Sequence, residues 1–301
     1  MLKRKKRDEL ADYPKTDLAI ETHEFNAEKG RDDGIEVETY ENEGIEITKA
    51  IIHSGRGEEI NGKRAGTYIT VEIGELQLMT SDEFEKRANC LSRLIGELVP
   101  SGEGCVLVAG IGNEEIISDA IGPKTASGIV ATRHIKRLKE DLYHSLQLSE
   151  VASVQTGVMG TTGIESAEIV SSLIKEIKPK CVIAVDSLAS RRLSRLATTV
   201  QISNAGISPG AGVANRRLEL NSETLGVPTI AIGIPTVVDA FTLVSDLTEG
   251  EECRKLCHGK NNFYVAPKES DKIIKEASKL LSSAINMALH NLTLKELKDF
   301  Q

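Results

Sequence analysis

Hydrophobic and polar positions follow two periods along this chain, and the change between them separates an early region from a later one. From Gly34 to Gly74 apolar and polar residues alternate in short runs between turn residues, which is typical of antiparallel strands. From Cys105 to Asn291 apolar runs of strand length alternate with segments whose apolar residues recur every three or four positions. We therefore expect an α/β fold with a mainly parallel sheet, helices on both faces, and a small antiparallel β addition near the N-terminus.

The same pattern gives approximate bounds for the elements. Strands are expected at residues 35–40, 44–47, 67–73, 105–109, 151–154, 181–185, 200–202 and 229–232. Helices are expected at residues 84–98, 123–138, 164–177 and 268–290, with a short arginine-rich helix after residue 186. The capping-box patterns Thr80-Ser-Asp-Glu83 and Thr162-Gly-Ile-Glu165 indicate where the first and third helices begin.

Two of the predicted strands lead to an aspartate. The strand at 105–109 continues through a glycine-rich turn to Asp119, and the strand at 181–185 is followed directly by Asp186. Ligands and chemistry collect at the carboxyl edge of a parallel sheet, so we expect both carboxylates there. Two carboxylates within hydrogen-bond reach cannot both ionise easily, so one keeps a proton while the other can deprotonate water. The pair therefore indicates peptide hydrolysis without a metal or a covalent nucleophile.

Other interpretations of these residues stay open on the pattern alone. Gly110-Ile-Gly-Asn113 is similar to a dinucleotide-binding turn, but it lacks the third glycine and an acidic residue about 20 positions further on. Asp119 and Asp186 could each cap the helix that follows. Asp239, after another apolar run, is a third carboxylate that competes for a catalytic place.

Composition excludes several classes of protein. The 301 residues are 40% hydrophobic and 27% charged, which is ordinary for a soluble globular protein. No apolar run approaches the roughly 20 residues needed to span a bilayer, so no membrane partner is expected. A net charge of −8 argues against direct nucleic-acid binding. Five cysteines without disulfide-framework spacing indicate a reducing compartment.

Motifs of other hydrolases are missing from the sequence. It contains neither a His-Glu-x-x-His metal motif nor a Gly-x-Ser-x-Gly elbow, and its histidines lack metal-ligand spacing. We therefore expect no metal and no cofactor. Lys3 to Arg7 are five consecutive basic residues without a following signal-peptide segment, and composition alone favours a solvated N-terminal tail.

Long ordered runs carry a resemblance to a known family. They are Lys15–Glu21, Gly112–Asn113, Asp119–Lys124, Thr132–His134, Gly157–Glu165, Val185–Arg191, Gln201–Ser203, Gly206–Gly212, Glu223–Pro228 and Ala231–Ala240. Through these runs the chain resembles the germination proteases of spore-forming bacteria, which degrade small acid-soluble spore proteins. The runs cover most of the chain and are very specific.

The resemblance implies an atypical aspartic endopeptidase, with a phosphorylase/hydrolase-like sheet. It places the two proposed catalytic aspartates at Asp119 and Asp186. It also implies a zymogen, a homotetramer, small acid-soluble spore proteins as substrate, and a place in the cytoplasm of the forespore and spore core. These properties are expectations that the resemblance supplies, and composition or spacing does not show them.

The resemblance also gives the N-terminus a meaning. Family substrates are cut after an acidic residue and before an apolar residue that Ala and then Glu follow. Thr16-Asp17-Leu18-Ala19-Ile20-Glu21 is similar to such a site, so we expect autoprocessing between Asp17 and Leu18. The domains would then be a pro-segment at 1–17 and one peptidase domain at 18–301, with residues 34–74 as a β-rich subregion. Recognition of an acidic substrate residue requires cationic side chains, for which the candidates are Lys124, Arg133, Arg191 and Arg192.

Two alternatives and one departure accompany this interpretation. The chain is shorter than is typical of the family between Asp246 and Val265, where an insert is reduced to Thr248–Tyr264. Hydrogenase-maturation endopeptidases share the glycine turn and strand-end carboxylates but sense nickel with a later histidine, and here only His258 and His290 follow Asp186. The second alternative is an inactive paralogue that binds spore proteins.

Overall fold

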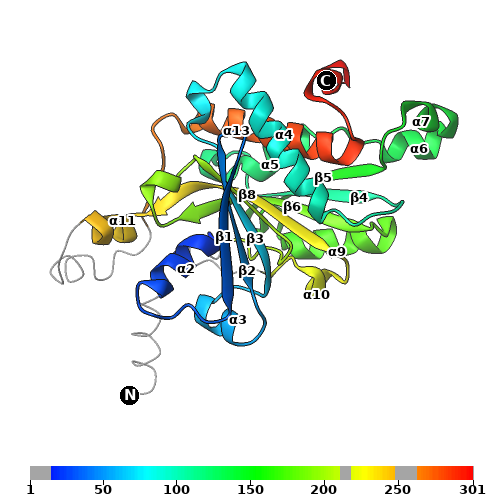
Figure 1. The fold of residues 1–301 in the computed structure, drawn as a ribbon. Helices are drawn as coiled ribbons and strands as arrows, with labels where there is room; N and C mark the ends of the chain where they lie inside the picture. Colours follow the sequence, from blue (N-terminus) through cyan, green and yellow to red (C-terminus); the bar gives the residue numbers. More distant parts are fainter. Residues whose placement is uncertain (1–14, 211–217, 248–262, 301) are drawn as a thin grey trace.

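The computed structural model of this chain describes residues 15–210, 218–247 and 263–300, and its centre is one mixed β-sheet (Figure 1). The strands follow the order β1-β2-β3-β7-β8-β6-β4-β5, and β9 pairs with β8. Their bounds are β1 Ile35–Asn42, β2 Ile45–Ile52, β3 Gly66–Glu72, β4 Val106–Ile111, β5 Val151–Gly157, β6 Cys181–Ser190, β7 Thr199–Ser203, β8 Thr229–Asp239 and β9 Tyr264–Val265.

Helices surround this sheet. The longer ones are α2 Ala19–Ala27, α4 Ser81–Leu98, α9 Ser166–Ile177, α11 Ala240–Leu247 and α13 Ser270–His290. Shorter ones are α3 Arg56–Asn61, α5 Ile121–Ser127, α6 Arg133–Leu138, α7 Glu140–Leu146, α8 Met159–Thr162, α10 Ser222–Leu225 and α14 Leu294–Leu297. Single 3₁₀ turns are η2 Leu76–Leu78, η3 Ile117–Asp119, η4 Leu193–Arg195 and η6 Lys298–Phe300. No helix among the described residues is both long and apolar enough to cross a membrane.

The sheet is parallel only in its inner part. β5, β4, β6 and β8 run parallel, whereas β1, β2, β3, β7 and β9 pair antiparallel with their neighbours. The expected mainly parallel sheet is therefore confirmed for the inner strands alone. The early strands are not a separate addition, because β3 pairs with β7 and so extends the same sheet.

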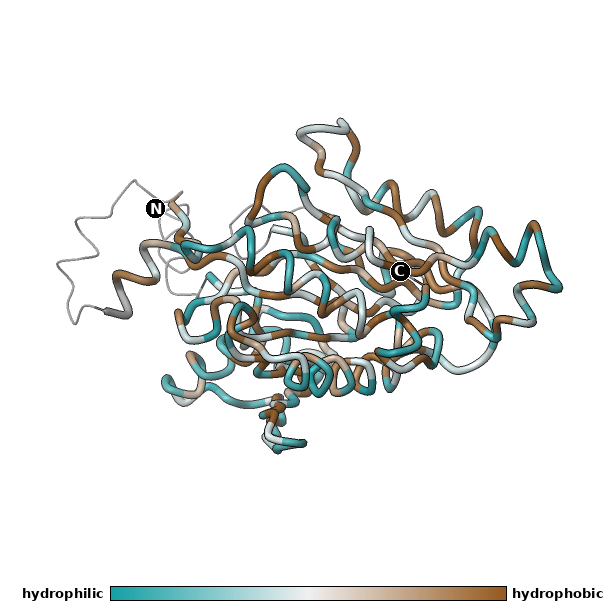
Figure 2. The backbone as a smooth tube through the Cα atoms, turned by 90° about the horizontal axis from the view of Figure 1, so that it is seen from above, coloured by the Kyte–Doolittle hydropathy of each residue, from teal (hydrophilic) through white to brown (hydrophobic). Residues whose placement is uncertain are grey.

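Alternate residues of the inner strands face two hydrophobic clusters. Val106, Val108, Ile183 and Val185 pack in the cluster that contains apolar residues of α4 and α13. The intervening residues of β4 and β6 belong to a second cluster with α9. Figure 2 shows apolar and polar residues alternating along the peripheral helices, as expected of helices with one face on the sheet.

Several helices and strands begin or end at other residues than the sequence predicts. β6 continues to Ser190, so Asp186 lies inside a strand and not after its end. Thr162 does not open a helix; it ends α8, and Glu165 is the N-cap of α9. The predicted helix at 123–138 is divided into α5 and α6. The shortened insert at 248–264 lies almost wholly outside the described residues.

Candidate active site

The loop after β4 holds Asp119 through close backbone contacts. Gly112 has φ of +119°, and a Cβ there would lie 2.1 Å from the Asp119 carbonyl oxygen. A Cβ at Gly122 would lie 2.2 Å from the carbonyl oxygen of Ile111 and 2.3 Å from that of Val185. These glycines therefore let the loop and the start of α5 press against the ends of β4 and β6. Their role is close packing, which accounts for the glycine-rich turn without a phosphate ligand.

Asp119 and Asp186 both lie where the pairing of β4 with β6 ends. Asp119 is in η3, and one of its carboxylate oxygens accepts a hydrogen bond from the Asn113 backbone N–H at 2.8 Å. Asp186 is 4% exposed and follows Val185, the last β6 residue that pairs with β4. η3 contacts β6 and β8, and the Thr236 hydroxyl donates to the Ser118 carbonyl at 2.6 Å. The fold thus brings the elements that carry both aspartates to one edge of the sheet.

Neither aspartate is a helix cap. The N-cap of α5 is Ala120, and no side chain caps that helix. Asp186 accepts from the backbone N–H of Ser187 within β6. The capping interpretations of both residues are therefore wrong.

Asp239 lies further along β8 than the residue that pairs with Asp186. β8 pairs Gly233 with Asp186, and Asp239 is six residues further along, or about 20 Å in an extended strand. Asp239 is buried, and its carboxylate forms an ion pair with Lys15 at 2.9 Å and accepts from the backbone and hydroxyl of Thr242. Its observed role is to hold the N-terminal segment.

That segment is ordered on the sheet. The Asp17 N–H donates to the Ala189 carbonyl at 2.8 Å, and the Ala189 N–H donates to the Asp17 carboxylate at 2.8 Å. Leu18 is fully buried in a cluster with Ile20 and Leu188. The solvated tail that composition favours is therefore wrong for residues 15–21, and residues 1–14 lie outside the described part of the chain.

Glu21 binds the chain just beyond β6. Its carboxylate accepts from the backbone N–H groups of Arg191 at 2.6 Å and Arg192 at 2.9 Å, and from the Thr16 hydroxyl at 2.5 Å. Arg195 lies 3.7 Å from the same carboxylate. Glu21 is 1% exposed, so its carboxylate contacts protein groups and almost no solvent.

The second turn of α2 binds the same arginine-rich region. Arg195 donates two hydrogen bonds to the Glu24 carboxylate, at 2.6 and 2.9 Å. Burial raises the pKa of Glu24, but the hydrogen bond and charge of Arg195 outweigh it, so the pKa lies below its usual value. The Arg192 side chain lies 3.3 Å from Glu24, and the Arg191 guanidinium stacks 4.9 Å from the Phe25 ring.

The four candidate cations are not in one place. Arg191 and Arg192 contact α2, and Lys124 on α5 lies 3.6 Å from Glu114 in the loop after β4. Arg133 on α6 pairs with Glu150, which directly precedes β5 at the amino edge of the parallel strands. The structure therefore separates Arg133 from the edge that holds the aspartates.

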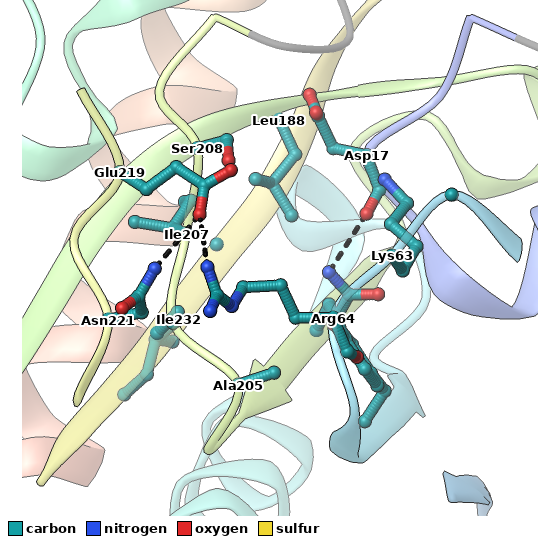
Figure 3. Close-up of a pocket in the computed structure, with 16 residues that line it drawn as sticks. Asp17, Lys63, Arg64, Leu188, Ala205, Ile207, Ser208, Glu219, Asn221 and Ile232 are labelled. Carbon is teal, nitrogen blue, oxygen red and sulfur yellow. Dashed lines mark hydrogen bonds and ion pairs between the residues drawn. The ribbon is translucent and has the colours of Figure 1, made fainter. Parts of the chain in front are cut away.

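A cavity of about 170 Å³ lies beside Asp17, the residue before the predicted cleavage point. Its walls include Asp17, Leu188, Gln201 and Gly233. Figure 3 shows Asp17 at one end, with Arg64 extended across the pocket towards Glu219, to which it donates a hydrogen bond at 2.8 Å. The cavity has room for several water molecules beside Asp17.

No three His, Cys, Asp or Glu side chains gather in a way that could hold a metal ion within the described ranges. Burial raises the pKa values of Cys105 and Cys181 to about 11, so neither thiol ionises readily at neutral pH. Both are core residues, as their place in apolar runs indicates.

Comparison with known proteins places the chain among peptidases. Residues 15–251 match the model of peptidase family A25, described as germination protease. The chain is 41% identical to the germination protease of Caldanaerobacter subterraneus subsp. tengcongensis, over 94% of this chain and 96% of that one. The chain therefore belongs to the germination protease family.

Two further comparisons complete the picture. The germination protease of Clostridium acetobutylicum is 38% identical over 91% of this chain and 94% of that protein. Among solved structures, a [NiFe] hydrogenase maturation protease HycI from Thermococcus kodakarensis covers 64% of this chain and 98% of its own, with 18% identity and a TM-score of 0.36. At that score the likeness adds nothing to the assignment.

Sequence reasoning missed several residues of this site. Gln201, the main chain of Ala189 and the ion pair of Lys15 with Asp239 all hold the N-terminal segment. Gln201 leaves a signal in the sequence, since it is a long polar residue between Val200 and Ile202 in an apolar strand. The other contacts join positions more than 170 residues apart, and no local pattern shows them.

Proposed function

We propose that this germination protease is an aspartic endopeptidase, made as a zymogen, that removes its own residues 1–17 and then cuts small acid-soluble spore proteins after an acidic residue. The observation that carries the proposal is the bound segment Thr16–Glu21. Its two acidic side chains are held at Ala189 and at Arg191–Arg192, and its apolar Leu18 is buried between them. A sequence like the family's substrate site is thus already docked on the face of the sheet that Asp186 occupies.

The chemistry follows from two carboxyl groups that share one proton. The ionised carboxylate takes a proton from water, whose oxygen attacks the carbonyl carbon of Asp17. The protonated partner donates to the carbonyl oxygen, and the tetrahedral intermediate then breaks its bond to the Leu18 nitrogen. That nitrogen takes up a proton as it leaves, so one water is consumed, giving a carboxylate on Asp17 and an amine on Leu18. Asp119 and Asp186 are the residues we assign to these roles.

The test is cleavage of a purified small acid-soluble spore protein, together with self-cleavage of the full chain. Cuts should follow Glu or Asp, survive chelators, and fall by about 10²–10⁴-fold in Asp119→Asn and in Asp186→Asn, which each remove one acid–base group. Asp271→Asn, an exposed aspartate at the start of α13, is the matched control and should cleave normally.

Other outcomes would replace the proposal. Cleavage that a chelator abolishes would favour a metal-dependent endopeptidase of the hydrogenase-maturation type. No cleavage, even by a chain that begins at Leu18, would favour an inactive protein that binds spore proteins. We also propose the homotetramer and the forespore location on the resemblance alone, and light scattering of the purified chain tests the first of these.

A further inference from the structure

Gln201 holds both sides of the bond that self-processing would cut. Its side-chain oxygen accepts from the Ala19 N–H at 2.8 Å, and its side-chain nitrogen donates to the Asp17 carbonyl oxygen at 3.1 Å. A backbone N–H can only donate and a carbonyl can only accept, so these partners fix the orientation of the amide. Gln201 is 8% exposed and has little room to turn.

The rest of the Asp17–Leu18 peptide is held as firmly. The Leu18 N–H donates to the Thr16 hydroxyl oxygen at 3.0 Å. The N–H and the carboxylate of Asp17 are both bound by Ala189, as described above, and the Lys63 ammonium donates to the Thr16 carbonyl at 2.9 Å. The carbonyl that faces Gln201 is therefore presented in one fixed direction.

Strand register puts Gln201 in line with Asp186. Gly233 of β8 pairs with Asp186 of β6 on one side and with Gln201 of β7 on the other. Residues directly opposite each other in a sheet point to the same face, so the Asp186 and Gln201 side chains share one face across three strands. Gly233 between them has no side chain, and a Cβ there would lie 2.6 Å from the side chain of Leu188. The glycine at this position therefore leaves room for the Leu188 side chain, which packs against Leu18.

We propose that Gln201 is a catalytic residue for self-cleavage, which donates its amide N–H to the oxyanion that forms on the Asp17 carbonyl oxygen. This inference rests on the proposed function. As water adds to the carbonyl carbon, the C=O electron pair moves onto oxygen, and the Gln201 nitrogen donates to the negative charge. When the intermediate collapses, this electron pair re-forms the C=O bond, the bond to the Leu18 nitrogen breaks, and that nitrogen takes up a proton. A donor fixed before the reaction stabilises this state without reorganisation, and loss of one such donor typically costs about 10²–10³ in rate.

Gln201→Glu separates this role from a structural one. The glutamate keeps an acceptor for the Ala19 N–H, and a negative charge at the start of α2 favours the helix. An ionised glutamate cannot donate to the Asp17 carbonyl. At neutral pH we expect full-length Gln201→Glu to cleave itself about 10²–10³-fold more slowly than the wild-type chain. On acidification the two rates should converge, since a protonated glutamate regains an O–H donor.

Controls distinguish the possible outcomes. Hydrogen exchange over residues 15–27 should be equally slow in Gln201→Glu and in the wild-type chain, and Gln155→Ala, on β5, should leave self-cleavage unchanged. A neutral-pH rate equal to the wild-type rate would overturn the role of Gln201 alone. Faster exchange together with slower cleavage would assign Gln201 to capping α2 and would also overturn it. A wild-type chain that cuts spore proteins but leaves Asp17–Leu18 intact would remove self-processing, and this inference with it.

Discussion

Single side chains near Glu21 contribute less than their charge suggests. The Glu21 carboxylate is bound by the main-chain N–H groups of Arg191 and Arg192, which any residue except proline supplies. We therefore expect Arg191→Ala and Arg192→Ala to keep self-cleavage at nearly the wild-type rate, since partly exposed ion pairs contribute about 0–1 kcal/mol. Glu21→Gln should slow it by about tenfold or more, because hydrogen bonds to a charged group contribute about 1.5–3 kcal/mol. Timed gel analysis of the full-length variants measures these rates.

The sequence alone favours the opposite result. It points to the arginine side chains as the pocket for an acidic residue. If Arg191→Ala or Arg192→Ala slowed processing as much as Glu21→Gln, the guanidinium groups would be the groups that recognise Glu21. The main-chain contacts would then be secondary.

At the scale of elements, α13 carries a pH-dependent contact. His290 is 3% exposed; its Nε2 lies 3.0 Å from the Val130 carbonyl oxygen, and its Nδ1 has no hydrogen-bond partner. Burial lowers the pKa of His290 below the usual value of 6.5. His290 therefore binds a proton more weakly in the folded chain than in the unfolded chain. The stability linked to His290 is present above pH 6.5 and is lost as the pH falls from there towards the folded pKa.

We therefore expect the melting temperature to fall on acidification below about pH 6.5 and to fall less steeply in His290→Gln, which does not titrate. Calorimetry across this range, with the exposed His144→Gln as control, measures the difference. Equal slopes for the wild-type chain and His290→Gln would show that the proton binds elsewhere.

Local patterns predict some elements well and others poorly. α4 and α13 are long and strongly amphipathic, and their expected ranges are close to the observed ones. The end of β6 was not predictable, because Asp186, Ser187 and Ser190 interrupt its apolar run although the strand remains paired with β8. The antiparallel strands were expected, but their union with the main sheet depends on β3 pairing with β7, about 130 residues away.

The candidate site likewise contains residues that local sequence patterns indicate and contacts that they do not. Asp119 and Asp186 could be named as candidates because each follows an apolar run. The docked N-terminal segment could not, since Asp17 meets Ala189 from 172 positions away and Ala19 meets Gln201 from 182. Composition describes such a segment as polar and mixed in charge, and only the tertiary fold provides its partners.

For the whole molecule, we expect acidification to speed self-processing. The proposed mechanism needs one protonated carboxyl group, and mild acid increases the population that has it. α2 should stay docked in this range, because the lowered pKa of Glu24 keeps it ionised: its contribution is present above its usual value of 4.5 and is lost only as the pH falls through the lower folded value. Timed processing of the full chain from pH 7.5 to about 5.5 measures the effect. A rate that is flat between mildly acidic and neutral pH would contradict this trigger.

The complete burial of Leu18 has a consequence for the product of processing. In the proposed self-cleavage its nitrogen belongs to a neutral amide before the cut, whereas afterwards it would be a chain terminus whose pKa is ordinarily about 8 and which carries a positive charge at neutral pH. An ammonium group enclosed by Ile20 and Leu188 loses its hydration, and such a loss costs several kcal/mol unless a counter-charge replaces it. The proposed cut would also form a carboxylate on Asp17, which supplies that counter-charge until residues 1–17 leave; the new terminus is then favoured to move towards water. The first turn of α2 would follow it, and the sheet face that carries Asp186 and Gln201 would then be accessible to a spore protein.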